Sequence, residues 1–272
     1  MFVLGKASAQ SFVLTGQFGN FIEAEDIVVN PISGILIVDK GNSSVIQMDS
    51  LFNVTSELGG YGWGSEGLAQ PTSVATTGLR TYICDRNNSR VQIYSKDLLF
   101  LYGITNEALN HLGYSLQLPE AVAVSPLGDV FVLDAGENRV LKFNYNNELI
   151  SVFGDFASGE FSLNNPTDIT YCESVGLVAV LHNNGIVFFD EFGSGVKSLI
   201  MHGIVAIEYY KGLLILSSEE QIITLSLSTF GLESLVISTT NSQPIKKAVL
   251  FEGKLYILSK NSVSLYEEIT NR

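Results

Sequence analysis

The sequence of 272 residues predicts an all-β fold, a six-bladed β-propeller with four antiparallel strands in each blade. Two observations lead to this prediction. A strand–turn–strand pattern recurs six times with a period of about 45 residues, and the N-terminal segment supplies a strand that the last copy lacks. The composition agrees, because 46% apolar and 16% charged residues with 25 glycines favour many short strands over long helices.

The centre of each copy is a hairpin in which an apolar strand ends in Asp, a polar turn follows, and an alternating strand leads away. The strongest copies are 34–49, 81–94 and 128–143. Their aspartates, at intervals of 46 and 49 residues, are Asp39, Asp85 and Asp134. Three weaker copies keep the shape but replace the aspartate, by Leu181, Ser217 and Ser259.

Each unit is completed by an inner strand before the hairpin and a fourth strand after it. Inner strands open after turn signals, as at 25–34, 71–78, 119–128 and 166–176. Fourth strands are expected in units one to five, at 51–58, 98–103, 149–154, 195–201 and 232–238. Unit six has none, so we expect residues 11–16 to pair beside 262–267 and close the ring.

The two ends of the chain give the domain prediction. Residues 11–272 form a single propeller domain, and residues 1–10 are either the remnant of a signal peptide or a flexible terminus. The Ala7-Ser8-Ala9 sequence before Gln10 fits the pattern that signal peptidase accepts, although the preceding apolar stretch is short and lacks a basic start. This pattern favours a periplasmic or otherwise extracytoplasmic location, outside a bacterial cytoplasm.

Charge and hydropathy exclude some partners. The net charge is −13, and apart from Lys246-Lys247 the basic residues are scattered, which disfavours nucleic acid and anionic membrane surfaces. Apolar runs stop after a few residues, far short of the roughly 20 that a membrane helix needs. No transmembrane segment is therefore expected.

The hairpins resemble those of the NHL-repeat propellers. In unit two, Asp85, Asn88 and Arg90 match the Asp, Asn and Arg of that repeat in order. Unit one has Asp39 and Asn42, and the match weakens from unit four onward. The resemblance implies a propeller that serves as a binding protein or an enzyme, since this fold supports both. An aspartate that recurs in each hairpin is more simply a structural device, which accepts N–H bonds of the turn and is reached by Arg90.

Cysteine and histidine give no strong site. Cys84 and Cys172 fall in blades that are not neighbours, so we expect two free, buried thiols. Lyases that resemble this fold hold zinc with several histidines facing the channel. The three histidines, at different positions in the repeat, are His111, His182 and His202. A zinc site of three imidazoles is therefore not expected.

Carboxylates at the start of the inner strands are the candidate metal ligands. Asp26 and Asp168 occupy this place in units one and four, which face each other, and Glu120 lies one residue earlier in unit three. Lactonase-like propellers use such carboxylates to hold a calcium-type ion, so a metal-dependent hydrolase or lyase is one functional prediction. The alternative is that these side chains are solvated or bond to amides of neighbouring blades.

The first functional prediction is a non-catalytic protein-binding or scaffold subunit, with a protein partner within a larger complex and no cofactor. Its support is the set of long connectors between blades, at 59–71, 103–119 and 154–166. The candidate anchors on these connectors are Tyr61, Trp63, His111 and Tyr114. Trp63 is either an anchor for a partner or packs against the next blade. The hairpins at 39–44 and 85–90 are expected on the opposite face.

Overall fold

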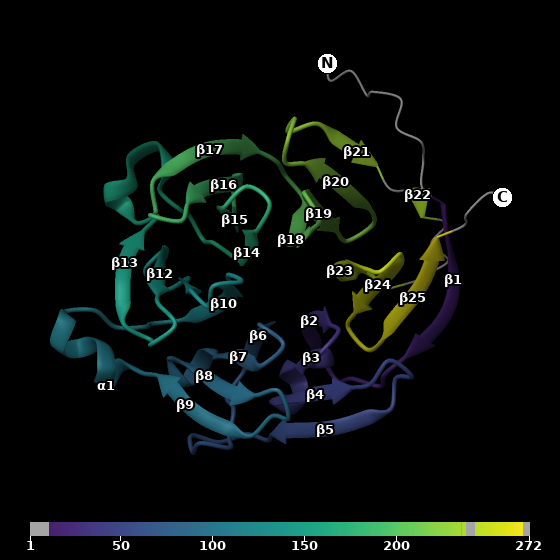
Figure 1. Cartoon of the computed structure of the whole chain (residues 1–272), viewed down its shortest axis with the longest axis horizontal. Helices are drawn as coiled ribbons and strands as arrows, with labels where there is room; N and C mark the ends of the chain where they lie inside the picture. The colour runs from purple at the N-terminus through teal and green to yellow at the C-terminus, as the bar shows by residue number, and fades with distance from the viewer. Residues whose placement is uncertain (1–10, 235, 238–242, 269–272) are drawn as a thin grey trace.

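The computed structural model describes residues 11–234, 236–237 and 243–268, and its strands form six sheets around a central axis (Figure 1). The prediction of a six-bladed propeller with four antiparallel strands per blade is confirmed. Residues 1–10, with the Ala7-Ser8-Ala9 pattern, lie outside the described residues. No helix in the described part of the chain is long and apolar enough to cross a membrane.

The first three blades follow the chain from inner to outer strand. Blade 1 contains β2 (Ala24–Asn30), β3 (Gly34–Asp39), β4 (Ser44–Met48) and β5 (Val54–Gly59). Blade 2 contains β6 (Pro71–Thr76), β7 (Arg80–Asp85), β8 (Arg90–Ser95) and β9 (Phe100–Ile104). Blade 3 contains β10 (Pro119–Val124), β11 (Val130–Asp134), β12 (Arg139–Phe143) and β13 (Leu149–Phe153).

The last three blades repeat this order. Blade 4 contains β14 (Asp168–Cys172), β15 (Leu177–His182), β16 (Gly185–Asp190) and β17 (Gly195–Ile200). Blade 5 contains β18 (Ile204–Tyr210), β19 (Leu213–Ser218), β20 (Ile222–Ser226) and β21 (Leu232–Ser234). Blade 6 contains β23 (Ile245–Phe251), β24 (Lys254–Ser259), β25 (Val263–Glu268) and, from the other end of the chain, β1 (Ser11–Phe18).

The helices are short and lie in turns and connectors. They are η1 (Lys40–Asn42), η2 (Arg86–Asn88), α1 (Asn106–Leu109), η3 (Asn110–Leu112) and η4 (Phe156–Phe161). Both η1 and η2 form the turn of a hairpin, and a serine in the left-handed conformation ends each of them. The other three belong to the connectors that lead to blades 3 and 4.

The strand β1 closes the ring as predicted. It pairs antiparallel with β25, from Phe12 opposite Glu268 to Phe18 opposite Val263. A feature that the sequence did not indicate is β22 (Val236–Ile237), which pairs in parallel with the start of β1. The predicted fourth strand of unit five is therefore divided: β21 stays in blade 5, and β22 joins the sheet of blade 6 (Figure 1).

The core consists of six clusters of buried side chains, and each cluster lies between two neighbouring blades. Between blades 3 and 4, for example, Phe131 and Phe153 pack with Ile169 and Phe189. The same arrangement of the described side chains recurs around the ring. Each blade buries both faces of its middle strands, which explains why these strands read as nearly continuous apolar runs.

Both cysteines are free and buried, as predicted. Cys84 lies on β7 of blade 2 and Cys172 on β14 of blade 4. Blade 3 separates them.

Candidate functional site

The hairpin aspartates bind the connectors. Asp39, Asp85 and Asp134 are fully buried. Asp39 accepts hydrogen bonds from the backbone N–H groups of Ile22 and Glu23, at 3.0 and 2.9 Å, just before the inner strand. Asp85 and Asp134 accept equivalent bonds from the connectors to their own blades. The structural interpretation is confirmed, but the N–H groups belong to the connector and not, as expected, to the turn.

Arg90 reaches back to Asp85 as predicted, with 2.7 Å between Nε and Oδ2. The same guanidinium also donates to three backbone carbonyls of the connector, those of Trp63, Gly64 and Gly67. The hairpin 85–90 therefore adjoins the connector 59–71, and the prediction that the hairpins lie on the opposite face was wrong. The physical reason is the antiparallel order, since the turn between the second and third strands emerges at the edge where the first strand begins.

The register of strand pairing corrects the predicted replacements of the aspartate in blades 4 and 5. Asp39 lies opposite Ala24, the first residue of the inner strand of blade 1. In blade 5 the inner strand begins at Ile204, and the residue opposite it is Ser218, not Ser217. In blade 4 the equivalent residue is His182, not Leu181. His182 also takes over the role of the aspartate, because its Nδ1 accepts the backbone N–H of Asn164 at 3.3 Å. Burial lowers the pKa of His182, which favours the neutral ring that this bond needs.

Tyr61 and Trp63 form an exposed aromatic pair. Each side chain is 72% exposed, and their rings meet edge to face with centroids 5.6 Å apart. Trp63 therefore does not pack against the next blade, which was one of its two predicted placements. The loop that holds the pair folds tightly. The backbones of Gly62 and Gly67 lie so close together that a Cβ on Gly67 would collide with Gly62.

His111 and Tyr114 lie on the next connector, after α1. His111 is exposed, and Tyr114 is partly covered by Arg139, whose guanidinium lies 5.7 Å from the ring centroid. This connector is at the rim of the ring, where α1 projects outward (Figure 1). The structure thus brings Tyr61 and Trp63 into contact and places His111 and Tyr114 on a separate loop.

The channel-facing residues form successive rings, one residue from each blade. Asp26 lies opposite Val38 of β3 in the strand pairing of blade 1. The strand pairing of each other blade identifies its equivalent residue. In order from blade 1 to blade 6 they are Asp26, Ser73, Ala121, Asp168, Ala206 and Lys247. The residue before each forms the ring nearer the mouth, which is Glu25, Thr72, Glu120, Thr167, Val205 and Lys246. Glu120 therefore belongs to a different ring from Asp26 and Asp168.

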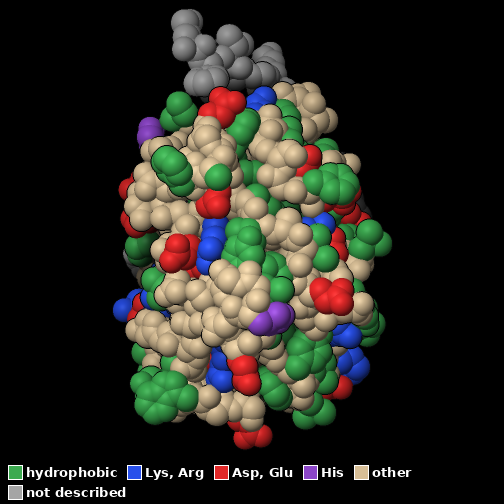
Figure 2. All heavy atoms as spheres, turned by 90° about the vertical axis from the view of Figure 1, so that its left-hand side faces the viewer, with side chains coloured by type: hydrophobic (Ala, Val, Ile, Leu, Met, Phe, Trp, Pro, Cys, Tyr) green, Lys and Arg blue, Asp and Glu red, His purple; other side chains and the backbone are tan. Residues whose placement is uncertain are grey.

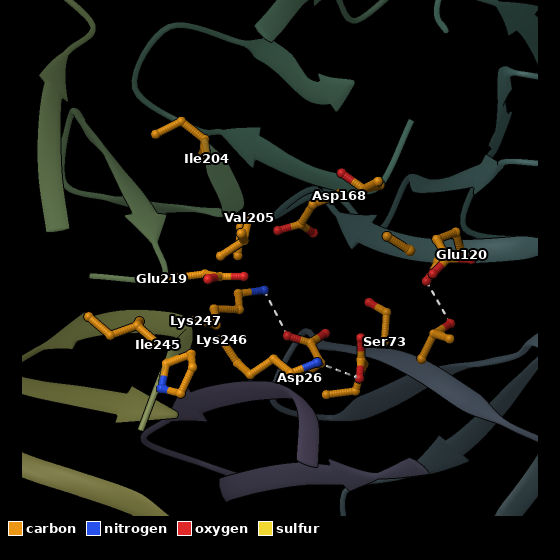
Figure 3. Close-up of a pocket in the computed structure, with 16 residues that line it drawn as sticks. Asp26, Ser73, Glu120, Asp168, Ile204, Val205, Glu219, Ile245, Lys246 and Lys247 are labelled. Atoms are coloured by element: carbon orange, nitrogen blue, oxygen red, sulfur yellow. Dashed lines mark hydrogen bonds and ion pairs between the residues drawn. The ribbon is translucent and has the colours of Figure 1, made fainter. Parts of the chain in front are cut away.

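A β-bulge explains why both rings face the channel. Strand residues normally alternate between two faces, so consecutive side chains point in opposite directions. In five of the six blades the register shifts at the start of the inner strand, for example between Ala24 and Asp26. The extra residue turns its side chain toward the channel as well. Together the two rings line a cavity of about 410 Å³ at the channel mouth (Figure 3).

Lys247 is the channel-facing residue that the sequence analysis did not single out. Its ammonium is buried in the channel, 2.8 Å from Asp26 Oδ1 and 3.2 Å from Glu208 Oε2. Burial alone would lower the pKa of Lys247. The charges of Asp168, Asp26 and Glu208 outweigh burial and hold the pKa well above its usual value. The only sequence signal was a doublet of lysines at the start of the sixth inner strand.

The predicted metal ligands mostly bond to backbone amides and cations. Asp26 accepts the N–H groups of Ile27 and, in the next blade, Val74. Asp168 does the same with Ile169 and Ile207. Glu120 lies away from both and pairs with Arg86 at 2.6 Å. Bonds to amides of neighbouring blades were the alternative prediction for these carboxylates.

In this structure a cation of the chain itself already contacts one of the predicted metal ligands. The Lys247 ammonium lies 2.8 Å from Asp26 Oδ1, so a divalent ion would have to displace it to bind this oxygen. Within the described ranges, no three His, Cys, Asp or Glu side chains are grouped closely enough to hold one. The calcium-type ion stays a prediction for metal analysis.

The three histidines are separated from the cavity. His111 lies on the connector to blade 3, His182 at the end of β15, and His202 in the connector to blade 5. None of them is among the residues that line the channel mouth.

Known proteins resemble the chain in fold. No family model matches it, and neither does any curated protein. Virginiamycin B lyase from Staphylococcus aureus, as a catalytically inactive histidine-to-alanine variant with quinupristin, is similar with a TM-score of 0.64. The identity is 11%, over 96% of this chain and 95% of that chain. The selenomethionine form of that lyase gives a TM-score of 0.65 at 11% identity, over 95% of this chain and 100% of that chain.

A structure of streptogramin B lyase is also similar, with a TM-score of 0.63 and 10% identity over 95% of this chain and 98% of that chain. At such low identity the likeness shows the fold alone, a β-propeller.

Proposed function

We propose that this chain is a non-catalytic binding protein that docks a protein partner on the surface formed by the connectors and hairpins. The single observation that carries the proposal is the exposed pair of Tyr61 and Trp63 on a fixed loop. Large aromatic side chains contribute much of the binding energy at protein interfaces, and a loop that is already ordered loses little entropy on binding.

The loop is fixed by its hairpin. Besides the three bonds from Arg90, Asn88 donates to the carbonyl of Gly62 at 2.9 Å and Gln92 to that of Gly67 at 3.0 Å. The Tyr94 hydroxyl donates to the carbonyl of Ser65. Side chains of β8 and its turn thus hold the loop along its length, so the aromatic pair is displayed and not free to collapse.

The side of the outer rim that Figure 2 shows is a less distinct surface, because its side chains are mixed in type. Figure 2 shows hydrophobic, acidic and basic side chains interspersed over the side of the ring that carries α1 and β13. The aromatic pair on the connector is the more specific feature, since mixed surfaces of this kind are ordinary for proteins.

The finer parts of the proposal rest on the sequence. The Asp–Asn–Arg hairpins support an NHL-type propeller that acts as a scaffold subunit. The Ala7-Ser8-Ala9 pattern supports a location outside the cytoplasm.

The test begins with the partner that co-purifies with the chain from its native source and continues with the purified pair. We expect Trp63→Ala to weaken binding about tenfold or more, as for a central aromatic anchor. Phe192→Ala is the matched control, because Phe192 is 76% exposed but lies in the turn between β16 and β17. Hydrogen exchange should show protection at 59–71 and 103–119. Protection of the turns at 30–34 and 125–129 instead would contradict the proposal.

A metal-dependent hydrolase or lyase is the second candidate, and the structural neighbours favour it because they are lyases. The similar virginiamycin B lyase is inactive when a histidine is replaced, whereas no histidine lines the cavity of this chain. Metal analysis separates the two functions. A stoichiometric divalent ion that is lost in Asp26→Asn and Asp168→Asn, with turnover of quinupristin that depends on it, would establish the lyase and overturn the binding proposal.

A further inference from the structure

The channel below the cavity contains more negative than positive charge. Three carboxylates, those of Asp26, Asp168 and Glu208, surround the single ammonium of Lys247. The ammonium contacts Asp26 and Glu208, and Asp168 contacts neither it nor any other cation within the described residues. Lys247 acts on Asp168 only from beyond contact distance, and a buried carboxylate that no cation contacts favours either a proton or an incoming cation.

Asp168 differs in this respect from the other carboxylates around the cavity for which ion pairs are seen. Glu25 has Lys40 and Lys246, Glu120 has Arg86, and Asp26 has Lys247. Asp168 is only 8% exposed and accepts one backbone N–H on each oxygen. A carboxylate has about four acceptor positions, so each oxygen retains capacity for a further donor.

The cavity gives a cation access to this carboxylate. Asp168 lies on one wall, and Figure 3 shows its carboxylate across the cavity from Asp26, with Lys247 reaching in from the side. Ile204, Val205 and Ile245 from blades 5 and 6 add apolar surface on another side, where Figure 3 also shows the Glu219 side chain. A volume of about 410 Å³ has room for an alkyl chain of a few carbons.

We propose that the channel mouth binds an alkylammonium group, with its N–H donors on the Asp168 carboxylate and its alkyl stem against Ile204, Val205 and Ile245. Charged hydrogen bonds to a carboxylate and burial of the stem both favour this ligand. An anion would meet Asp26, Asp168 and Glu208 at the floor. The group belongs either to a free amine or to a lysine side chain of a protein, and the site does not depend on the aromatic pair.

The protonation of Asp168 fits this arrangement. Burial raises the pKa of Asp168 to about 6. The charge of Lys247 lowers this pKa, and the charges of Asp26 and Glu208 raise it further. The carboxyl therefore gains a proton just below neutral pH when it has no further counter-ion. A bound ammonium replaces that proton, so its affinity falls as the pH drops below 6.

The test uses n-butylammonium on the whole chain at pH 7.5, with 1-butanol as the uncharged isostere and tetramethylammonium as a cation without N–H donors. We expect only butylammonium to raise the melting temperature in proportion to the logarithm of its concentration. Its affinity, measured by calorimetry, should fall about tenfold or more in Asp168→Asn and change less than about threefold in Glu219→Gln. Glu219 is the matched control, an exposed carboxylate on the same cavity.

A second measurement on the unaltered protein keeps the test valid if Asp168→Asn does not fold. Butylammonium affinity should decrease between pH 7.5 and pH 5, whereas an equal affinity at both values would overturn the proposal. Equal stabilisation by butanol, or unchanged affinity in a folded Asp168→Asn, would also overturn it. So would stabilisation by calcium through Asp168 in place of the amine. A blocked lysine peptide that binds more tightly than butylammonium identifies a protein side chain as the source, and equal binding identifies a free amine.

Discussion

At the scale of single residues, the channel depends on Lys247. It occupies in blade 6 the ring position that Asp26 and Asp168 hold in blades 1 and 4. Its ammonium crosses to carboxylates of both neighbouring blades and so connects blade 6 with blades 1 and 5. A buried ion pair adds little net stability over apolar packing, but removing one partner leaves the others uncompensated.

The first prediction concerns this residue. Lys247→Met should destabilise the fold by about 3–5 kcal/mol at pH 7, because Asp26 and Glu208 lose the cation that contacts them and Asp168 loses a nearby favourable charge. A carboxyl group whose pKa is higher in the folded than in the unfolded state stabilises the fold at pH values below its unfolded pKa. This stabilisation is lost as the pH rises through the folded pKa. The deficit should therefore shrink between pH 6 and pH 4, in chemical denaturation at each pH.

Lys246→Met is its matched control. Lys246 is the neighbouring lysine, but it is more exposed, and its partner Glu25 also has Lys40. The expected loss is at most about 1 kcal/mol. Equal losses in the two variants, at all pH values, would show that the buried charges are not the cause.

At the scale of elements, each hairpin holds the connector that enters its blade. The aspartate binds connector amides, and in blade 2 Arg90 also binds connector carbonyls. The repeated motif is thus a clamp between two segments that are separate in sequence. In blade 2 it fixes a loop whose tip, with Tyr61 and Trp63, is exposed, while Leu68 and Ala69 near its end are buried.

The second prediction tests this clamp. Arg90→Ala should mobilise the loop 59–71 without unfolding the ring, because three loop carbonyls lose their donor. Trp63 is the only tryptophan, so its fluorescence anisotropy reports the loop directly. We expect a lower anisotropy in Arg90→Ala and no change in Arg86→Ala, since Arg86 binds Glu120 and not the loop. Unchanged anisotropy in both would show that the clamp does not order the loop.

The third prediction concerns β1, which carries the closure of the ring. Phe12 is buried in the cluster between blades 5 and 6, and Phe18 stacks on Phe52 with centroids 4.0 Å apart. Deletion of residues 1–18 should therefore cost roughly 3 kcal/mol or more, since a fully buried phenylalanine such as Phe12 contributes about 1.5–3 kcal/mol and the partly buried Phe18 adds to it. Urea denaturation measures this loss. A chain that begins at Ser11 is the control, and equal stability of the two truncated chains would contradict the closure.

At the scale of the whole molecule, the six interfaces between blades form a continuous cycle. Each cluster depends on the two blades beside it, and β1 completes the last blade from the opposite end of the chain. Opening one interface exposes apolar surface at both of its sides. We therefore expect the ring to open as one cooperative unit.

The fourth prediction uses the two thiols to test this cooperativity. Burial raises the pKa of Cys172 to about 12 and that of Cys84 well above its usual value, so neither reacts while the ring is closed. Cys84→Ala and Cys172→Ala leave one thiol each, in blades 4 and 2. Both should react with a thiol reagent at the same rate in any urea concentration. Leu127→Cys, at a residue 83% exposed, is the control for immediate reaction. Different rates would show that the blades open separately.

The sequence by itself determined the number of blades, the hairpins and the closing strand. These features follow from alternation and turn residues within short segments, and each local pattern reports its own strand. The repeat of Asp39, Asp85 and Asp134 marked the structural device, and the composition of 59–71 marked the exposed loop. No contact between distant residues was needed for any of them.

Only the tertiary structure decided the channel. Spacing in the sequence aligned Leu181 with the hairpin aspartates, whereas the strand pairing of blade 4 and the bond to Asn164 place His182 there. The charge of Lys247 acquires its meaning from Asp26, which is 221 residues away in the chain and adjacent in the ring. The predicted ring makes the first and sixth blades neighbours, but which side chains meet between them depends on the register of each inner strand, and periodicity within a blade does not contain that register.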